Sequence, residues 1–195
     1  MVDCTGHGVP GAIMSIVGNN LLNKILKEEK ITSCEKMLDS LVTNLVQYLR
    51  QDNKDGRISN DGMDITLCKI NMKSRKVEFA GAFNPMAVIK DGELKEYKAD
   101  KFSVGRHTYE AGYKFSSVTF EVEKGSMLYL FSDGYSDQFG GAKGKKFMRK
   151  NFYNLLKSLS NLPAAQQSKE LEKSFNEWKQ DVTQVDDVCV MGIRI

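Results

Sequence analysis

The sequence holds few of the residues from which common metal and redox sites are built. Its 195 residues include two histidines, His7 and His107, and four cysteines, none of which lie in a C-x-x-C pair. Zinc sites in proteins are usually made from clusters of such side chains at short, regular spacings. The scarcity of histidine and the scatter of the cysteines therefore argue against a zinc site.

The four cysteines are far apart in the sequence, and each stands in an apolar or helical stretch. Free cysteine is among the most buried residue types, and disulfides are rare in the cytosol. We therefore expect four reduced, buried thiols and a cytoplasmic location. The cysteines are Cys4, Cys34, Cys68 and Cys189.

A large charge of one sign and a long apolar run are also lacking. The 28 Lys and Arg residues and the 25 Asp and Glu residues leave a net charge of +3. So weak a charge gives no reason to expect nucleic acid or an anionic membrane as a partner. No stretch approaches the roughly 18 apolar residues that indicate a membrane span, and no signal peptide precedes the first motif. We expect this chain to contact neither nucleic acid nor membrane.

What is present is the composition of an ordinary globular domain. Hydrophobic residues make up 41% of the chain and charged residues 27%, so it can bury a substantial core. No internal repeat and no long linker divides the sequence. We therefore expect one domain over residues 1–195.

Apolar residues recur at helical spacing in the first quarter of the chain. The pattern predicts a helix over about 10–27 and a second helix over 34–50. Thr32 and Glu35 have the spacing of a capping box, which would open the second helix. The polar stretch 51–62 is rich in Asp, Asn and Gly and predicts a loop.

The middle of the chain changes to the two-residue period of strands. The Asp91-Gly92 pair between two short strands predicts a tight hairpin, and the apolar run 127–132 predicts a strand buried on both faces. Helices over about 147–159 and from Pro163 onward follow. This order predicts an α+β fold with helices packed on antiparallel sheets. The expected strands cover 63–71, 75–82, 86–90, 93–97, 115–122, 127–132 and 188–195.

The stretch DCTGHGVPGA contains Gly6-x-Gly8-x-x-Gly11, the spacing of a dinucleotide-binding loop. That fold needs a strand after the first helix, whereas a second helix is expected here. The later strands also read as hairpins, which a parallel sheet does not use. We therefore interpret the glycines as a bend and the preceding acid, Asp3, as the functional residue. A thermal shift with NAD or ATP would support the nucleotide reading instead.

Acidic residues stand at the ends of three expected strands. Asp3 follows Val2, Asp133 follows the buried strand, and Asp186 and Asp187 open the last strand. Carboxylates gathered in a dry cleft repel one another, and a divalent cation would relieve that repulsion. Oxygen ligands favour Mg²⁺ or Mn²⁺ over zinc. The plain alternative is that each acid caps a turn, since Asp-Gly is a favoured turn dipeptide.

Five blocks of the sequence resemble those of PPM-type (type 2C-like) serine/threonine phosphatases, and in particular the SpoIIE-like bacterial sigma-regulator branch. The likeness runs from Asp3 to Ile195, and the five blocks together are specific where no single one is. It implies a β-sandwich of two antiparallel sheets flanked by helices. The blocks are DCTGHGVPGA, NDGMDITLCKI, GAFNPMAVIK, LYLFSDGYSDQFGG and DDVCVMGIRI.

The resemblance also implies a site for two Mg²⁺ or Mn²⁺ ions. The ligands that carry over are the side chains of Asp3, Asp133 and Asp186 and the backbone carbonyl of Cys4. In that family a water held by the metals attacks the phosphorus of a phosphoserine or phosphothreonine, so no nucleophilic side chain is needed. The three aspartates would thus be catalytic through the metal-bound water.

Four further residues of the matching blocks are secondary candidates. Asp187 either binds metal or holds the turn, and Asp64 and Asp137 are candidates for a supporting or third-metal acid. His7 is a candidate general acid, although a glycine turn often needs only a compact polar side chain.

The resemblance implies partners as well. The usual substrates of this branch are small phosphorylated anti-sigma-factor antagonists, an upstream sensor domain is common, and the first two helices act as a regulatory switch. Family members carry a further aspartate on a strand upstream of the first block. We therefore expect a chain that lacks its first strands, binds metal weakly and turns over poorly. An open sheet edge would favour a homodimer, which sedimentation at high concentration would test.

Two hypotheses from different classes thus remain. The first is a metal-dependent phosphoprotein phosphatase. The second is a catalytically impaired module of the same fold that acts in partner binding and signalling.

Overall fold

Residues 1–6, 8–49 and 61–195 are described by the computed structural model and fall into two units. Unit 1 comprises residues 1–85 and 98–122, and unit 2 comprises residues 86–97 and 123–195. The expected loop over 51–62 lies almost wholly outside the described residues, as does His7. The single domain over 1–195 stays a prediction.

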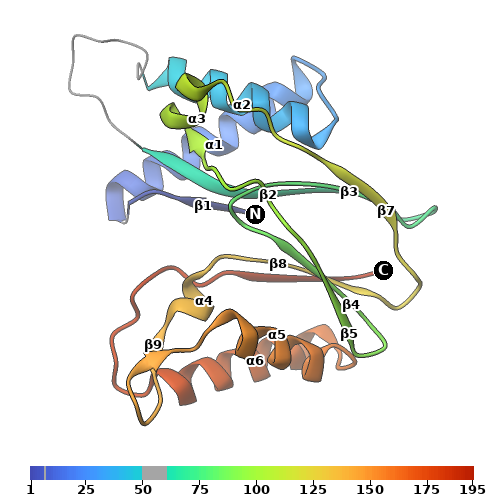
Figure 1. Ribbon diagram of the computed structural model, residues 1–195, viewed down its shortest axis with the longest axis vertical. Coiled ribbons are helices and arrows are strands. Elements are labelled where there is room, and N and C mark those ends of the chain that lie inside the picture. Colours follow the sequence, from blue (N-terminus) through green and yellow to red (C-terminus); the bar gives the residue numbers. More distant parts are fainter. Residues whose placement is uncertain (7, 50–60) are drawn as a thin grey trace. The chain divides into compact units, whose positions relative to one another are not determined.

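The sheet of unit 1 is antiparallel, with the order β1-β2-β3-β7, and β6 pairs with β2 (Figure 1). The long strands β2 and β3 pair from Ile65 opposite Ala82 to Asn71 opposite Lys76. Residues on both faces of β3 are buried, among them Val77 and Phe79 on one face and Ala80 and Ala82 on the other. The strands are β1 (Val2–Cys4), β2 (Gly62–Asn71), β3 (Lys76–Ala82), β6 (Val104–Gly105) and β7 (Val118–Glu121).

Two helices, α1 (Gly8–Lys27) and α2 (Cys34–Tyr48), pack on one face of this sheet (Figure 1). Each contributes an apolar stripe at helical spacing to the core of unit 1. The short helix α3 (Arg106–Ala111) follows β6 and contacts α2. The buried side chains of the two long helices include Met14, Val17, Leu21, Ile25, Leu38, Leu41 and Leu45.

The first turn of α2 is held by a residue from the sheet. The expected capping box of Thr32 and Glu35 is wrong: Ser33 occupies the N-cap position and makes no side-chain cap hydrogen bond. Instead the backbone N–H of Cys34 donates to Glu78 Oε1 on β3 at 2.6 Å, and Lys69 Nζ pairs with Glu78 Oε2 at 2.6 Å. A carboxylate at this end of a helix satisfies an otherwise orphan N–H and complements the helix dipole.

Replacing Glu78 by alanine should lower the free energy of unfolding by about 1–2 kcal/mol, the usual effect of losing a helix cap. Burial pushes the pKa of Glu78 up, but the hydrogen bonds from Lys69 and Cys34 outweigh it and leave the pKa below its ordinary value of 4.5. A depressed pKa means that the stabilisation is present at neutral pH and is lost as the pH falls through that lowered value. Urea unfolding of both proteins at neutral and at acidic pH measures this.

The exposed carboxylate of Glu121 on β7 provides the matched control, because Glu121→Ala removes the same charge without removing a cap. Equal stabilities of Glu78→Ala and Glu121→Ala at neutral pH would contradict this role of Glu78.

The sheet of unit 2 is also antiparallel, with the order β11-β8-β4-β5. Strand β8 lies between β11 and β4, and all five of its residues are buried, as its apolar sequence predicts. The hairpin of β4 and β5 turns at Asp91-Gly92, where both residues have positive φ, the type I′ geometry that this dipeptide favours. The strands are β4 (Met86–Lys90), β5 (Glu93–Tyr97), β8 (Met127–Phe131) and β11 (Val190–Arg194).

Helices α5 (Arg149–Leu159) and α6 (Ala164–Lys179) lie along one face of this sheet (Figure 1). A short helix, α4 (Gly134–Asp137), follows β8, and a small ribbon of β9 (Phe139–Gly140) and β10 (Lys145–Lys146) comes after it.

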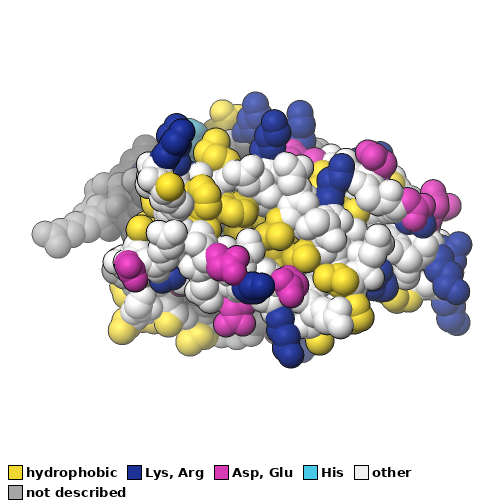
Figure 2. Space-filling model, turned by 90° about the horizontal axis from the view of Figure 1, so that it is seen from below, with side chains coloured by type: hydrophobic (Ala, Val, Ile, Leu, Met, Phe, Trp, Pro, Cys, Tyr) yellow, Lys and Arg dark blue, Asp and Glu magenta, His cyan; other side chains and the backbone are white. Residues whose placement is uncertain are grey.

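Figure 2, seen from below, shows basic, acidic and apolar side chains interspersed. Such a mixed surface agrees with the weak net charge and forms no patch of one sign in this view.

The structure confirms the predicted α+β class with antiparallel sheets and flanking helices. Sequence reasoning missed α3, α4 and the shortest strands.

The expectation of four buried cysteines is wrong for Cys189, which is exposed, while Cys34 is buried and Cys4 and Cys68 are half-buried. Of the helices in the described residues, none combines the length and the apolar character that crossing a membrane requires.

Candidate functional site

Two predicted metal ligands of unit 2, Asp133 and Asp186, lie close enough to affect each other's charge. Asp133 lies two residues after the end of β8 and occupies the N-cap position of α4. Burial raises the pKa of its half-buried carboxyl group, and the charges of Asp186 and Asp137 raise it further. The electrostatic repulsion expected among these acids is therefore present within unit 2.

The segment that carries Asp186 is held against the end of β8 by Ser132, which precedes Asp133. The Ser132 hydroxyl donates to the carbonyl oxygen of Asp187 and accepts from the backbone N–H of Cys189, both at 3.0 Å. The Ser132 N–H also donates to the Cys189 carbonyl at 3.0 Å. The serine of the S-D-G sequence thus fixes the distance between the two acidic segments, a role that its sequence position alone did not indicate.

Gly134 allows the same two segments to touch. A Cβ atom built on Gly134 would clash with the carbonyl oxygen of Asp187 and would lie 3.4 Å from the Cβ atom of Asp186. Only glycine leaves room for this close approach of the two backbones. The glycine of S-D-G is therefore required by packing and is not simply a turn residue.

Gln138 holds the residues just before Asp186. Its side chain is fully buried and its amide donates to the carbonyl of Thr183 at 3.1 Å, while its Oε1 accepts from the N–H of Val185 at 3.3 Å. A buried amide that is satisfied in this way fixes the path of the segment it binds. This role explains the conspicuous polar residue within the otherwise apolar QFGG sequence, and sequence reasoning missed it.

The predicted ligand Asp3 lies in unit 1, within strand β1 rather than after it as expected. It stands directly opposite Asp64 of β2, so the two side chains emerge on the same face of the sheet. Asp64 also accepts a short hydrogen bond from the hydroxyl of Ser103. Unit 1 therefore brings two of the candidate acids together, of which Asp64 was predicted only as a secondary one.

The glycines that follow Asp3 form a bend, as the sequence analysis interpreted them. Gly6 has a φ of +89°, which residues with a side chain rarely adopt. A Cβ atom on Gly11 would lie 2.6 Å from the carbonyl oxygen of Gly6, so the loop folds tightly onto the start of α1. Helix α1 is followed by α2 and not by a strand, which agrees with rejecting a dinucleotide fold.

Two basic side chains of unit 2 interact with acids of the same unit, although neither basic residue stands next to an acid in the sequence. Lys146 Nζ pairs with Asp137 Oδ2 at 2.7 Å, and the charge of Arg149 lowers the pKa of Asp133 slightly against the larger effects that raise it. The candidate Asp137 thus has a protein cation as partner, whereas Asp133 is dominated by burial and by neighbouring acids. Asp186 and Asp187 are exposed, and the Asp187 N–H donates to Asp186 Oδ1 at 2.7 Å.

Three cysteines are unsuited to nucleophilic chemistry. Burial raises the pKa of Cys34 to about 12 and that of Cys68 to about 11, and it also raises the pKa of Cys4. These groups are therefore protonated thiols at neutral pH, and the thiolate is the reactive form. The structure offers no support for a mechanism through a cysteinyl-phosphate at these positions.

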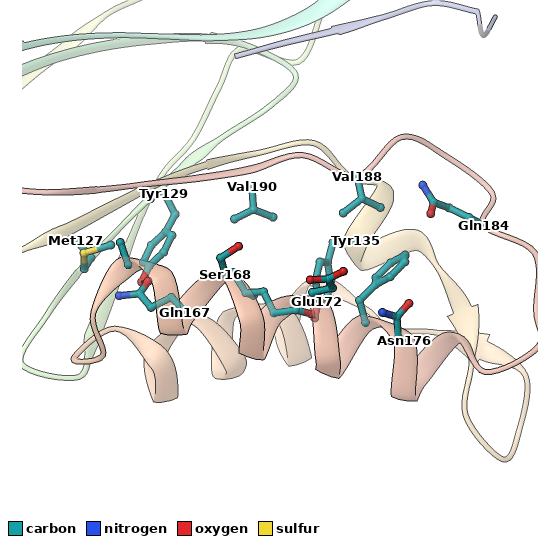
Figure 3. Close-up of a pocket in the computed structure, with 14 residues that line it drawn as sticks. Met127, Tyr129, Tyr135, Gln167, Ser168, Glu172, Asn176, Gln184, Val188 and Val190 are labelled. Atoms are coloured by element: carbon teal, nitrogen blue, oxygen red, sulfur yellow. Dashed lines mark hydrogen bonds between the residues drawn. The ribbon is translucent and has the colours of Figure 1, made fainter.

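A cavity of about 460 Å³ lies in unit 2 between α6 and the strands β8 and β11 (Figure 3). Ser168, Glu172 and Asn176 point into it from α6, and Tyr129 closes one end, where its hydroxyl donates to Gln167 Oε1 at 2.8 Å. Asp133 and Asp186 do not line it. The two acids are therefore not part of the wall of this cavity, although the lining residue Gln184 donates to the Asp186 carbonyl at 2.8 Å.

The residues present suit a hard divalent cation. Each unit contributes carboxylate oxygens that face other carboxylates, Asp3 with Asp64 and Asp133 with Asp186, and such oxygen donors favour Mg²⁺ and Mn²⁺. Within the described ranges, no group of three or more His, Cys, Asp or Glu side chains is gathered closely enough to hold a metal ion. The predicted ligands are thus presented in pairs, and the assignment of Asp3, Cys4, Asp133 and Asp186 to metal stays a prediction.

The sequence matches the family described as Stage II sporulation protein E (SpoIIE) over residues 1–195. The chain belongs to the SpoIIE family. Comparison with curated protein sequences gives no match.

Solved structures share the fold of this SpoIIE-family chain. The SiaA-PP2C domain of Pseudomonas aeruginosa is 24% identical with a TM-score of 0.88, over 100% of this chain and 74% of that one. The PP2C phosphatase domain of SpoIIE from Bacillus subtilis, solved with a fragment of its regulatory domain, is 17% identical with a TM-score of 0.74. That match covers 100% of this chain and 53% of the other, so the chain spans about half of that structure.

A third similar structure was solved with metal. The catalytic domain of the serine/threonine protein phosphatase PstP, in complex with two manganese ions, is 16% identical with a TM-score of 0.61. The match covers 97% of this chain and 83% of that one. At these identities the likeness establishes the fold, which is that of PP2C-type phosphatase domains.

Proposed function

We propose that this chain is a metal-dependent protein phosphatase that removes phosphate from phosphoserine or phosphothreonine of a regulatory protein of the anti-sigma-factor antagonist type. The observation that carries the proposal is the apposition of Asp133 and Asp186 by Ser132 and Gly134, in a chain that belongs to the SpoIIE family. The raised pKa of Asp133 supports it, because mutually repelling carboxylates suit a cation.

The proposed ligands are Asp3 and the Cys4 carbonyl from unit 1, and Asp133 and Asp186 from unit 2. When bound, two Mg²⁺ or Mn²⁺ ions would supply an activated water and neutralise charge on the phosphoryl oxygens. The chain's own contribution is to hold the carboxylates in place. Ser132 and Gln138 fix the segment before β11, and the Ser103 hydroxyl orients Asp64 beside Asp3. Asp187 stays a secondary candidate, and its backbone N–H donates to Asp186 Oδ1.

Removal of metal tests the proposal most simply. The purified protein with Mn²⁺ should hydrolyse a phosphoserine peptide, and EDTA should reduce the rate at least about 100-fold, with recovery on adding excess Mn²⁺ or Mg²⁺. Phosphate release measures the rate. A rate that is unaffected by EDTA, or no release above the uncatalysed background with either metal, would contradict the proposal.

A second candidate function is a catalytically impaired module of the same fold. It is favoured by the finding that, over residues 1–6, 8–49 and 61–195, no three potential metal-ligating side chains are gathered together. Such a module would bind a phosphorylated partner without hydrolysing it. Binding of a phosphopeptide with no release of phosphate at any Mn²⁺ concentration would identify it.

The proposed partners follow from the same family membership. They are a phosphorylated protein substrate and a sensor domain that controls the chain, with α1 and α2 as the switch. The four free thiols support the proposed cytoplasmic location. A homodimer through a sheet edge stays a prediction, and β1 and β11, which are edge strands of their sheets, are the candidates for such pairing.

A further inference from the structure

A second cavity, of about 700 Å³, lies wholly in unit 1 and carries an excess of cationic side chains. The cations Lys101 and Arg106 line it, against the single acid Glu110, and His107 lines it as well. These residues come from the segment between β5 and β7 that includes α3. A concave site with clustered positive charge suits an anionic group.

The cavity adjoins Asp3. Thr5, two residues after Asp3, lines the cavity, as does Gly62. The Thr5 N–H donates to the Gly62 carbonyl at 3.0 Å, and the Thr5 hydroxyl accepts from the Gly62 N–H at 3.2 Å. Ser103 lines it too, and its hydroxyl donates to Asp64, which stands opposite Asp3. A group bound in the cavity would therefore lie beside the proposed metal ligand of unit 1.

Of the two basic side chains that line the cavity, one is exposed and the other is held by a hydrogen bond. Lys101 is exposed and has no charged or hydrogen-bonded partner among the residues that the structure describes. Arg106 donates from Nε to Glu110 at 2.7 Å, which orients its guanidinium group and leaves its terminal nitrogens free to donate further. The Lys101 ammonium group is a compact positive charge on a flexible chain, and Arg106 presents a planar guanidinium group whose orientation is fixed. Together they suit carboxylate or phosphate oxygens.

Aromatic side chains form the apolar part of the same wall. The rings of Phe102 and Tyr113 stack with their centroids 4.9 Å apart, and His107 meets Tyr113 edge to face at 6.0 Å. Phe83 also lines the cavity although it is 56% exposed. Exposed aromatic rings beside cations are typical of surfaces that bind peptides.

Phe83 is held in this exposed position by an unfavourable backbone conformation. Its φ is +64°, and the N–H of Asn84 donates to the carbonyl of Ala82 at 2.7 Å across a three-residue turn. The Phe83 N–H donates to the backbone carbonyl of Asp100 at 2.9 Å, and the Thr66 hydroxyl donates to the Asn84 carbonyl at 2.9 Å. A strained turn that presents a large apolar ring to solvent indicates a functional contact, because the ring gains no burial in the folded chain.

We propose that this cavity binds the part of the phosphoprotein substrate that flanks the phosphorylated residue, and that it selects acidic flanking side chains. Lys101 and Arg106 bind the acidic groups, and Phe83 packs on the neighbouring apolar portion of the segment. The proposal rests on the proposed phosphatase function for the identity of the partner. It adds the residues that recognise that partner and the charge that they prefer.

The first test measures binding without catalysis. Two fluorescent phosphoserine peptides are compared in EDTA by anisotropy, one with Asp and Glu flanks and one with Asn and Gln in their place. The wild type should bind the acidic peptide about tenfold more tightly than the neutral one, whereas Lys101→Glu should bind the two peptides about equally. Lys98→Glu is the matched control, because Lys98 is exposed in the same unit and does not line the cavity.

A second variant separates binding from folding. Phe83→Gly removes the ring, and glycine adopts the positive φ readily. This variant should therefore bind both peptides about fivefold more weakly without a lower melting temperature. Equal binding of the two peptides by the wild type, or equal effects of Lys101→Glu and Lys98→Glu, would overturn the proposal.

The same peptides with Mn²⁺ distinguish this inference from the phosphatase proposal. If the acidic peptide is hydrolysed with a higher kcat/KM than the neutral one and Lys101→Glu abolishes the ratio, both are supported. If binding discriminates but no phosphate is released, the cavity assignment holds and the phosphatase proposal is wrong. If hydrolysis occurs without discrimination in either assay, the phosphatase proposal holds and the cavity assignment is wrong.

Discussion

Replacing Asp133 by asparagine should reduce Mn²⁺-dependent phosphatase activity by about 10²–10³-fold, the usual effect of removing one preorganised electrostatic group from an active site. Asparagine has almost the same shape, so the change removes charge and leaves the packing of the turn. The raised pKa of Asp133 shows that burial and neighbouring acids oppose its charge in the folded protein. The metal-free variant should therefore be at least as stable as the wild type.

The measurement pairs phosphate release in Mn²⁺ with thermal unfolding in EDTA. Asp181→Asn serves as control, because Asp181 is an exposed acid of the same unit whose side chain has no charged or hydrogen-bonded partner among the described residues. Opposite changes in activity and stability are the signature of a functional acid. An Asp133→Asn protein that keeps its activity, or that loses activity only because it unfolds, would contradict the assignment.

Replacing Gly134 by alanine should have the second large effect. The added methyl group would collide with the Asp187 carbonyl and push the segment that carries Asp186 away from Asp133. We expect a loss of about 1–3 kcal/mol in the free energy of unfolding, as for other overpacked sites. We also expect Mn²⁺-dependent activity to fall by at least about 100-fold, since small displacements of catalytic groups have effects of this order.

Gly140→Ala separates these two effects. A Cβ atom there would collide with the Trp178 carbonyl, which is a backbone clash of the same kind but one that does not touch Asp186. Both variants should lose stability, which urea unfolding measures, but only Gly134→Ala should lose activity at a temperature where both are folded. Similar residual activities in the two folded variants would show that the spacing of Asp133 and Asp186 is unimportant.

Much of the fold could be predicted because local signals and packing agree. The β4–β5 hairpin follows from Asp91-Gly92, and the burial of β8 follows from its unbroken apolar run. Helix α1 was predicted to within about two residues of its start, and its end at Lys27 was predicted correctly. Segments with a strong period or a strong turn dipeptide are those in which local preference and tertiary packing point to the same structure.

The failures have the opposite cause, since the deciding contacts lie far away in sequence. The start of α2 is set by Glu78, more than forty residues later, so its local Thr32–Glu35 pattern misled. Helix α3 has only six residues and no measurable period. The C-terminal acids are positioned by Ser132 and Gln138, whose roles depend on pairing with a segment some fifty residues away.

The candidate site was predicted in part. Sequence reasoning named Asp133 and Asp186 and expected them to interact, and the structure brings them together within unit 2. It also named Asp3 and Asp64, which face each other in unit 1, although Asp3 was expected after a strand and lies within one. The tight packing at Gly134 was not predicted, because the Asp-Gly dipeptide is equally consistent with an ordinary turn.

The proposed function requires Asp3, Asp133 and Asp186 each to be a metal ligand. Calorimetric titration of Mn²⁺ into the wild type, Asp3→Asn and Asp133→Asn tests it most directly. The proposal predicts that each of the two substitutions weakens Mn²⁺ binding at least about tenfold. Wild-type affinity and stoichiometry in Asp3→Asn, with a loss in Asp133→Asn alone, would contradict the account.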